Sequence, residues 1–123
     1  MSLSSEEKLR RLERSLEYGG GTHTVQDVVK CVREGSAQFW SHGDGLIVTE
    51  LHSFPRMKAA HYWLISGALP DCLALDDPIS QWAIREGCSV ATATGRKGWG
   101  KAGAPYGWRP HMYTFVKDLG HGT

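Results

Sequence analysis

The chain has 123 residues, of which 41% are hydrophobic and 22% are charged, and this composition fits one globular domain. Its 14 basic and 13 acidic side chains give a formal net charge of +1, which argues against a general nucleic-acid-binding surface. Because no apolar run reaches the length of a membrane span and the N-terminus is polar and charged rather than a signal peptide, we expect a soluble, cytoplasmic protein.

The first element is a predicted helix that ends near the glycine triplet at residues 19–21. A serine cap and acidic residues in the first turn favour its start, and Leu9, Leu12 and Leu16 recur at helical spacing. This apolar stripe is narrow, so two alternatives stay open. The helix packs on the domain, or residues 1–21 form an arm with a glycine linker that binds a partner protein or a second copy through these leucines.

A second helix and three strands are predicted next. Thr24 and Asp27 form an approximate capping box, and Gly35 ends the helix. Turn residues then separate short apolar runs, which is typical of an antiparallel meander. The predicted strands cover residues 37–40, 46–51 and 57–67.

The third of these strands is the expected centre of the sheet. Simple alternation places Ala59, His61, Trp63 and Ile65 on one face and Ala60, Tyr62, Leu64 and Ser66 on the other. Both faces are apolar enough to be covered, so helices are expected on both sides of the sheet.

The remaining chain predicts a helix, a strand, a short helix and a terminal strand. Residues 69–86 are helical, but the start signal Asp76-Asp77-Pro78 leaves open whether they form one helix or two. A strand at 88–94 follows this crossover, so it should pair parallel with the central strand. The glycine-rich stretch 95–105 predicts a short helix and turn, and residues 111–119 alternate as a terminal strand before a tail at 120–123.

The three cysteines, Cys31, Cys72 and Cys88, are widely spaced and form no Cys-x-x-Cys motif. We therefore predict buried thiols, with neither a metal site nor a disulfide framework.

Taken in this order, residues 22–119 resemble the GNAT acetyltransferase superfamily. The likeness rests on three stretches. They are the central strand at 60–65, residues 79–88, where the helix ends and the next strand begins, and the turn Gly107-Trp108-Arg109-Pro110 before the terminal strand. Within that superfamily the chain most resembles short GNAT-like proteins of tailed bacteriophages and prophages. The resemblance implies an α+β fold with a mixed, twisted sheet, and a location in the bacterial host cytosol or the phage particle.

Departures from the family pattern concern its cofactor chemistry. The family binds the acetyl-CoA pyrophosphate with the motif [RQ]-x-x-G-x-[GA] after the central strand, and this chain has Ser66-Gly67-Ala68-Leu69-Pro70-Asp71 there. Pro70 donates no N–H, and Asp71 brings a negative charge. The family's tyrosine that protonates the leaving thiolate is also missing, because its position is Gly103.

Two residues of the central strands are candidates for a general base, namely Glu50 and His61. Each has a structural alternative: Glu50 as a carboxylate at the rim of the sheet, and His61 as a hydrogen-bonded core histidine.

These observations lead to two functional hypotheses. In the first, which we favour, the protein has the GNAT fold without acetyl-CoA and is a structural or interaction component, associated with a phage virion. In the second, it is an acetyl-CoA-dependent N-acetyltransferase with Glu50 or His61 as the base. The residues that would then hold the cofactor are Ser66, Gly67, Ala68, Arg96 and Lys97.

Overall fold

The computed structural model describes residues 4–18, 20–95 and 97–120. Its helices and strands are, in chain order, α1 (Ser5–Tyr18), α2 (Val25–Glu34), β1 (Ala37–His42), β2 (Gly45–Ser53), β3 (Lys58–Ser66), α3 (Leu69–Arg85), β4 (Val90–Ala93), α4 (Lys97–Gly103) and a 3-10 turn (Ala104–Tyr106). None of the helices in these ranges combines the length and the apolar character that crossing a bilayer requires.

The two N-terminal helices begin where the capping residues predict. The N–H of Glu7 donates to Ser4 Oγ at 3.2 Å, at the start of α1. At α2, the N–H of Asp27 donates to Thr24 Oγ1 at 3.2 Å, and the Thr24 N–H donates to the Asp27 carboxylate at 2.8 Å. The capping box is therefore confirmed, and it lowers the pKa of Asp27 through the hydrogen bonds from Thr24.

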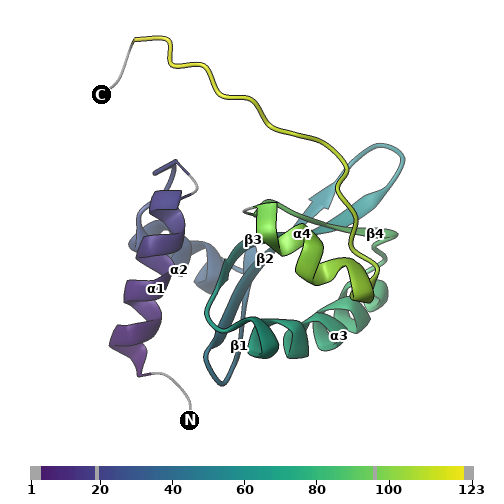
Figure 1. The fold of residues 1–123 in the computed structure, drawn as a ribbon, viewed down its shortest axis with the longest axis horizontal. Coiled ribbons are helices and arrows are strands. Elements are labelled where there is room, and N and C mark those ends of the chain that lie inside the picture. The colour runs from purple at the N-terminus through teal and green to yellow at the C-terminus, as the bar shows by residue number, and fades with distance from the viewer. Residues whose placement is uncertain (1–3, 19, 96, 121–123) are drawn as a thin grey trace.

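The strands form one mixed sheet in the order β1-β2-β3-β4 (Figure 1). The β1–β2 and β2–β3 pairs are antiparallel, whereas β3 and β4, which the α3 crossover separates, are parallel. The predicted α+β fold class is thus confirmed, with the meander, the crossover helix and the parallel strand in the expected order.

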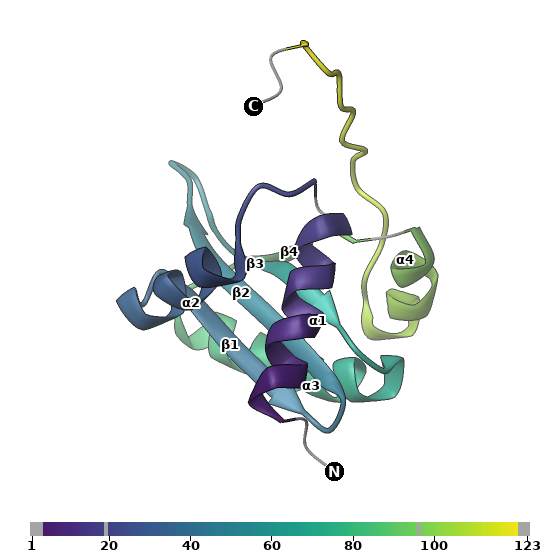
Figure 2. The ribbon, with the colours of Figure 1, turned by 90° about the vertical axis from the view of Figure 1, so that its left-hand side faces the viewer.

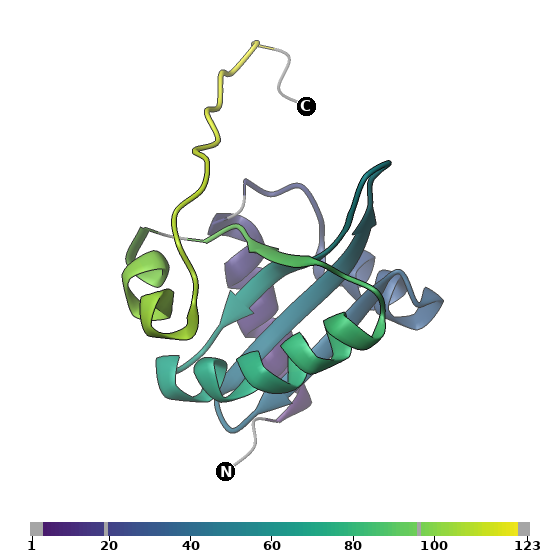
Figure 3. The ribbon, with the colours of Figure 1, turned by 90° about the vertical axis from the view of Figure 1, so that its right-hand side faces the viewer.

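Helices cover both faces of this sheet. Helices α1 and α2 lie over one face (Figure 2), and α3 runs across the opposite face (Figure 3). Each face has its own buried apolar cluster. The cluster under α1 and α2 contains Leu12, Leu16, Val28, Ala37, Val48 and Leu64. The cluster under α3 contains Ile47, Tyr62, Cys72, Leu75 and Ile79.

Helix α1 packs on the domain, which favours the first of the two alternatives for this segment. Leu12 and Leu16 are each only 4% exposed and belong to the apolar cluster on that face. Leu9, one turn earlier, is 43% exposed. Of the three leucines predicted to bind a partner, two are therefore used in the protein's own core.

An irregularity in β3 changes which side chains share a face. Val48 pairs with Leu64 and Thr49 pairs with Tyr62, so Trp63 is an extra residue in β3. Because this bulge interrupts the alternation, Leu64 packs on the α1–α2 side and Ile65 on the α3 side. The prediction that Ile65 shares a face with His61 and Trp63 is therefore wrong.

Helix α3 is continuous through Pro78, so of the two alternatives left open for this segment the structure has one helix, despite the start signal at Asp76. Four of its residues, spaced to face the sheet, are buried: Cys72, Leu75, Ile79 and Ala83. We attribute the continuity to this burial, which outweighs the one intrahelical hydrogen bond that Pro78 cannot donate.

The predicted terminal strand is also absent. Residues 111–119 have no regular secondary structure, and the segment extends away from the body (yellow in Figure 1). Alternation alone does not make a strand, because its N–H and C=O groups need a neighbouring strand to bond to. We refer to residues 109–119 as the C-terminal segment.

Candidate functional site

The sheet opens where β3 continues past the end of β4. The two strands pair only from Ala59–Val90 to Tyr62–Ala93. The last residues of β3, from Trp63 to Ser66, extend beyond this pairing. This opening is the place where the GNAT resemblance predicts the cofactor, so the residues around it decide what the site can hold.

The start of α3, at one end of the opening, is packed tightly against the β1–β2 turn. Gly67 has φ +109°, and a Cβ at this position would collide with the Asp44 carbonyl. The Asp44 N–H donates to the Asp71 carboxylate at 2.9 Å, and Arg11 lies 3.6 Å from the Asp44 carboxylate. The glycine and the aspartate of the predicted cofactor loop therefore both have structural roles in this packing.

These residues fit a pyrophosphate poorly. Pro70 removes one N–H from the first turn of α3, and the Asp71 carboxylate places a negative charge beside the N–H groups that an anion would need. Ser66 and Ala68 complete the loop. The Ser66 carbonyl already accepts a hydrogen bond from the Cys72 thiol, with the sulfur 3.3 Å from the oxygen. Arg96 lies outside the described residues, and of Lys97 only its backbone position at the start of α4 is described.

At the other end of the opening, Asp76 joins three elements. Its Oδ1 accepts hydrogen bonds from Tyr62 Oη on β3 at 2.8 Å and from the indole N–H of Trp108 at 3.3 Å. The Tyr62 and Trp108 rings meet edge to face with centroids 5.0 Å apart. We call these three residues the Asp76 cluster. Sequence reasoning assigned Asp76 to a helix cap and missed this role, for which a mid-helix aspartate gives no signal.

Burial and the Asp76 charge shape the chemistry of this cluster. Both raise the pKa of Tyr62 well above its usual value, burial being the larger cause. Tyr62 therefore stays protonated and serves as a hydrogen-bond donor, not as a base. Trp99 and Trp108 both pack against the apolar cluster under α3, so aromatic rings cover this side of the opening.

The two predicted bases come together on the opposite side of the sheet. Glu50 pairs with His61 across β2 and β3, and His61 pairs with Thr92 across β3 and β4. His52 Nε2 lies 3.4 Å from Glu50 Oε1. The His52 and His61 rings are stacked, with their centroids 5.1 Å apart. His61 Nδ1 in turn lies 2.8 Å from Thr92 Oγ1. We call these four residues the histidine row.

Burial favours the neutral form of His61. Desolvation is the main cause that lowers the pKa of His61, the nearby His52 lowers it further, and Glu50 acts in the opposite direction. A neutral imidazole at physiological pH can accept a proton, as a general base must. Sequence reasoning found Glu50 and His61, but it missed His52 and Thr92, which only the strand register places beside them.

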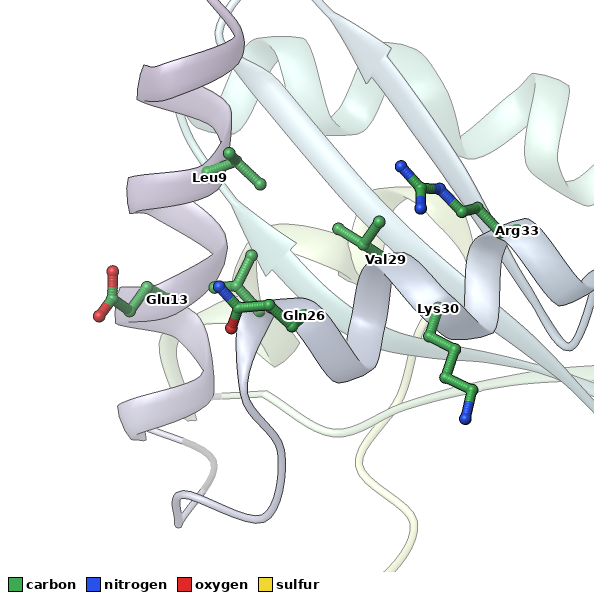
Figure 4. Close-up of a pocket in the computed structure, with 7 residues that line it drawn as sticks. Leu9, Glu13, Gln26, Val29, Lys30 and Arg33 are labelled. Atoms are coloured by element: carbon green, nitrogen blue, oxygen red, sulfur yellow. The ribbon is translucent and has the colours of Figure 1, made fainter.

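A separate groove of about 430 Å³ lies between α1 and α2 (Figure 4). Leu9 and Val29 give it an apolar lining, Glu13 stands on the α1 side, and Lys30 and Arg33 stand on the α2 side. This groove contains the exposed member of the predicted partner-binding leucines.

The comparisons with known proteins give a likeness of fold. No family model and no curated protein sequence matches the chain. Among solved structures, a probable acetyltransferase superposes with a TM-score of 0.72 at 10% identity, covering 96% of this chain and 92% of the other. A transcriptional regulator from Bacillus halodurans C-125 gives 0.70 at 10% identity and 97% coverage of both chains. A GNAT family acetyltransferase from Staphylococcus aureus gives 0.59 at 13% identity, covering 97% of this chain and 96% of the other.

The chain therefore has the GNAT fold along nearly its whole length. At these identities the likeness concerns the fold alone, and the neighbours include both a probable acetyltransferase and a transcriptional regulator. Activity must be argued from the site.

Proposed function

We propose that this protein uses the GNAT fold without acetyl-CoA and is a structural or interaction component. The Asp76 cluster carries this proposal. Trp108 lies against Tyr62, the residue at which β3 and β4 stop pairing, and Asp76 ties both side chains to α3. A pantetheine chain running into the opening on this side would have to displace the indole and leave the Asp76 carboxylate with one donor fewer.

The start of α3 supports the same proposal. Two members of the cofactor loop, Gly67 and Asp71, are engaged with the β1–β2 turn, and Pro70 offers no N–H. The biological setting that we propose is a tailed-phage particle, and this part rests on the resemblance of the sequence alone.

Calorimetric titration with acetyl-CoA, and then with CoA, tests the proposal. We expect no saturable heat at about 1 mM ligand, a level at which micromolar binding would be unmistakable. Near-UV circular dichroism of the same sample confirms that it is folded. A micromolar Kd would overturn the proposal. In that case Ala68→Asp, at the start of α3, should abolish binding at the predicted loop, whereas Ile84→Asp, near the other end of the same helix, should not.

The histidine row favours a second candidate, an N-acetyltransferase. A neutral His61 backed by Thr92, with His52 bridging towards Glu50, could take a proton from an amine. Release of free CoA thiol from acetyl-CoA in the presence of a panel of amines tests this reading. Activity that His61→Gln lowers by roughly 100-fold, the usual contribution of a general base, would support it, and His42→Gln on β1 is the matched control. No thiol release above the rate without protein would reject it.

A further inference from the structure

The C-terminal segment exposes more large apolar surface than any other described part of the chain. Met112, Tyr113, Phe115, Val116 and Leu119 are between 76% and 92% exposed. Contiguous apolar side chains with this exposure mark a surface that another surface covers. Because Met112 and Tyr113 are neighbours, as are Phe115 and Val116, an extended backbone places apolar side chains on both of its faces, as in a strand that packs on both sides.

The described sheet offers an edge for such a strand. β4 is a terminal strand of the sheet and pairs only with β3 among the described residues. Its residues Val90–Ala93 contain no charge and no proline, the features with which edge strands are usually protected from pairing. Its side chains are small, so they leave room for aromatic neighbours on an added strand.

The direction of the C-terminal segment points to another molecule. Trp108 is anchored to Asp76 and Tyr62, and the chain leaves it through Arg109-Pro110, where proline keeps the backbone extended. Figure 3 shows the segment rising away from the sheet instead of turning back along β4. Eleven extended residues span up to about 36 Å, which is enough to reach a neighbouring protein.

We propose that the C-terminal segment of one copy pairs as an additional strand with the β4 edge of a second copy, and that the exchange is reciprocal. A two-fold arrangement of this kind satisfies both edges and covers both exposed segments with the same contacts. The occupant is a second copy because the chain itself carries both halves of the interface. The inference goes beyond the proposed function and does not depend on whether acetyl-CoA binds.

Light scattering during size-exclusion chromatography provides the first test. At roughly 100 μM we expect a mass of twice 13.6 kDa, because a dimer of micromolar affinity is largely formed there. Phe115→Asp should return the mass to 13.6 kDa. Ile84→Asp is the matched control, since Ile84 is also an exposed large apolar residue, at 65%, but lies on α3 and should leave the dimer intact.

Two neighbouring proline variants test whether the contact is a strand pairing. Successive N–H groups of a strand point to opposite sides, so only one of Thr114 and Phe115 can donate to β4. Each proline variant is compared with alanine at the same position, so that the loss of the side chain cancels. Relative to alanine, we expect one of Thr114→Pro and Phe115→Pro to weaken the dimer by about 100-fold more than the other, because a reciprocal dimer loses two ladder bonds at about tenfold each.

Hydrogen exchange of the wild-type protein completes the test. Amides of the C-terminal segment should be protected in the dimer and lose protection on dilution. A monomer at this concentration overturns the proposal, as does a dimer that survives Phe115→Asp. Protection that is independent of concentration would mean that the segment pairs with its own β4, and this would also overturn it.

Discussion

The two ends of this chain differ in a way that their sequences do not suggest. Both carry several apolar side chains within a short stretch, three leucines at helical spacing in α1 and a mixture of aromatic and aliphatic residues in the C-terminal segment. In the structure, Leu12 and Leu16 are 4% exposed, whereas Phe115 and Val116 are 90% and 92% exposed. The end that could have been a detachable arm is part of the core, and the end that was expected to complete the sheet stands apart from it.

The difference follows from what each pattern needs in order to be covered. A helix satisfies its own backbone, so a narrow apolar stripe needs only an apolar face to lie on, and the α1–α2 side of the sheet provides one. A strand must also find a neighbour for its N–H and C=O groups. The C-terminal segment has no such neighbour within the described chain.

The largest expected effect tests the packed end. Leu16→Ala should lower the free energy of unfolding by about 2–5 kcal/mol, because it leaves a cavity between α1 and the sheet. Leu9→Ala, on the same helix but 43% exposed, is the control and should cost under about 1 kcal/mol. Urea denaturation measures both. Equal small effects would mean that α1 behaves as an arm after all.

The next effect concerns the point where the C-terminal segment leaves the body. Asp76→Ala removes the acceptor shared by Tyr62 and Trp108 and should cost about 1–3 kcal/mol, since two partly buried donors lose their partner. Asp77→Ala changes an exposed neighbour on the same helix and should be close to neutral. Thermal unfolding of the pair measures the difference. A neutral Asp76→Ala would show that the segment is not anchored through this cluster.

Much of this fold could be predicted from local sequence signals. Capping residues such as Thr24, Asp27 and Gly35 act within a few residues of themselves, so helix boundaries followed from the sequence. The errors and the questions left open arose where distant contacts decide. The bulge at Trp63 depends on the register with β2, and the continuity of α3 through Pro78 depends on burial against the sheet.

The candidate site likewise contains some residues that the sequence reveals and others that only the folded structure brings to them. Glu50 and His61 were recognisable as ionisable residues on central strands, but their partners His52 and Thr92 come from strand register. Asp76 was visible only as a helix-start signal, because its bonds to Tyr62 and Trp108 span 14 and 32 residues of sequence.

A smaller effect is expected from the histidine row, on the face that α1 and α2 partly cover. Because the pKa of His61 is lowered in the folded chain, the unfolded chain takes up a proton first as the pH falls below about 6.5. Wild-type stability should therefore decrease from that pH down to the lowered pKa of folded His61.

His61→Gln removes this component, so the stability difference between wild type and variant should shrink in acid. Urea titrations near pH 8 and pH 5 measure it, with His42→Gln as the control. A difference that is independent of pH would mean that His61 is not desolvated.

The smallest effect is expected from Phe115→Ala at low protein concentration. A side chain that is 90% exposed contributes little to the stability of a monomer, so the free energy of unfolding should change by less than about 0.5 kcal/mol. At high concentration the wild type should gain stability by mass action, because only the folded chain offers a β4 edge, and Phe115→Ala should gain less. Thermal unfolding over a hundredfold dilution series separates the possibilities. A loss that is the same at every concentration would place Phe115 against its own domain, and the contrast between the two ends of the chain would then disappear. A loss that appears only at high concentration would locate the missing cover of the C-terminal segment on a second molecule.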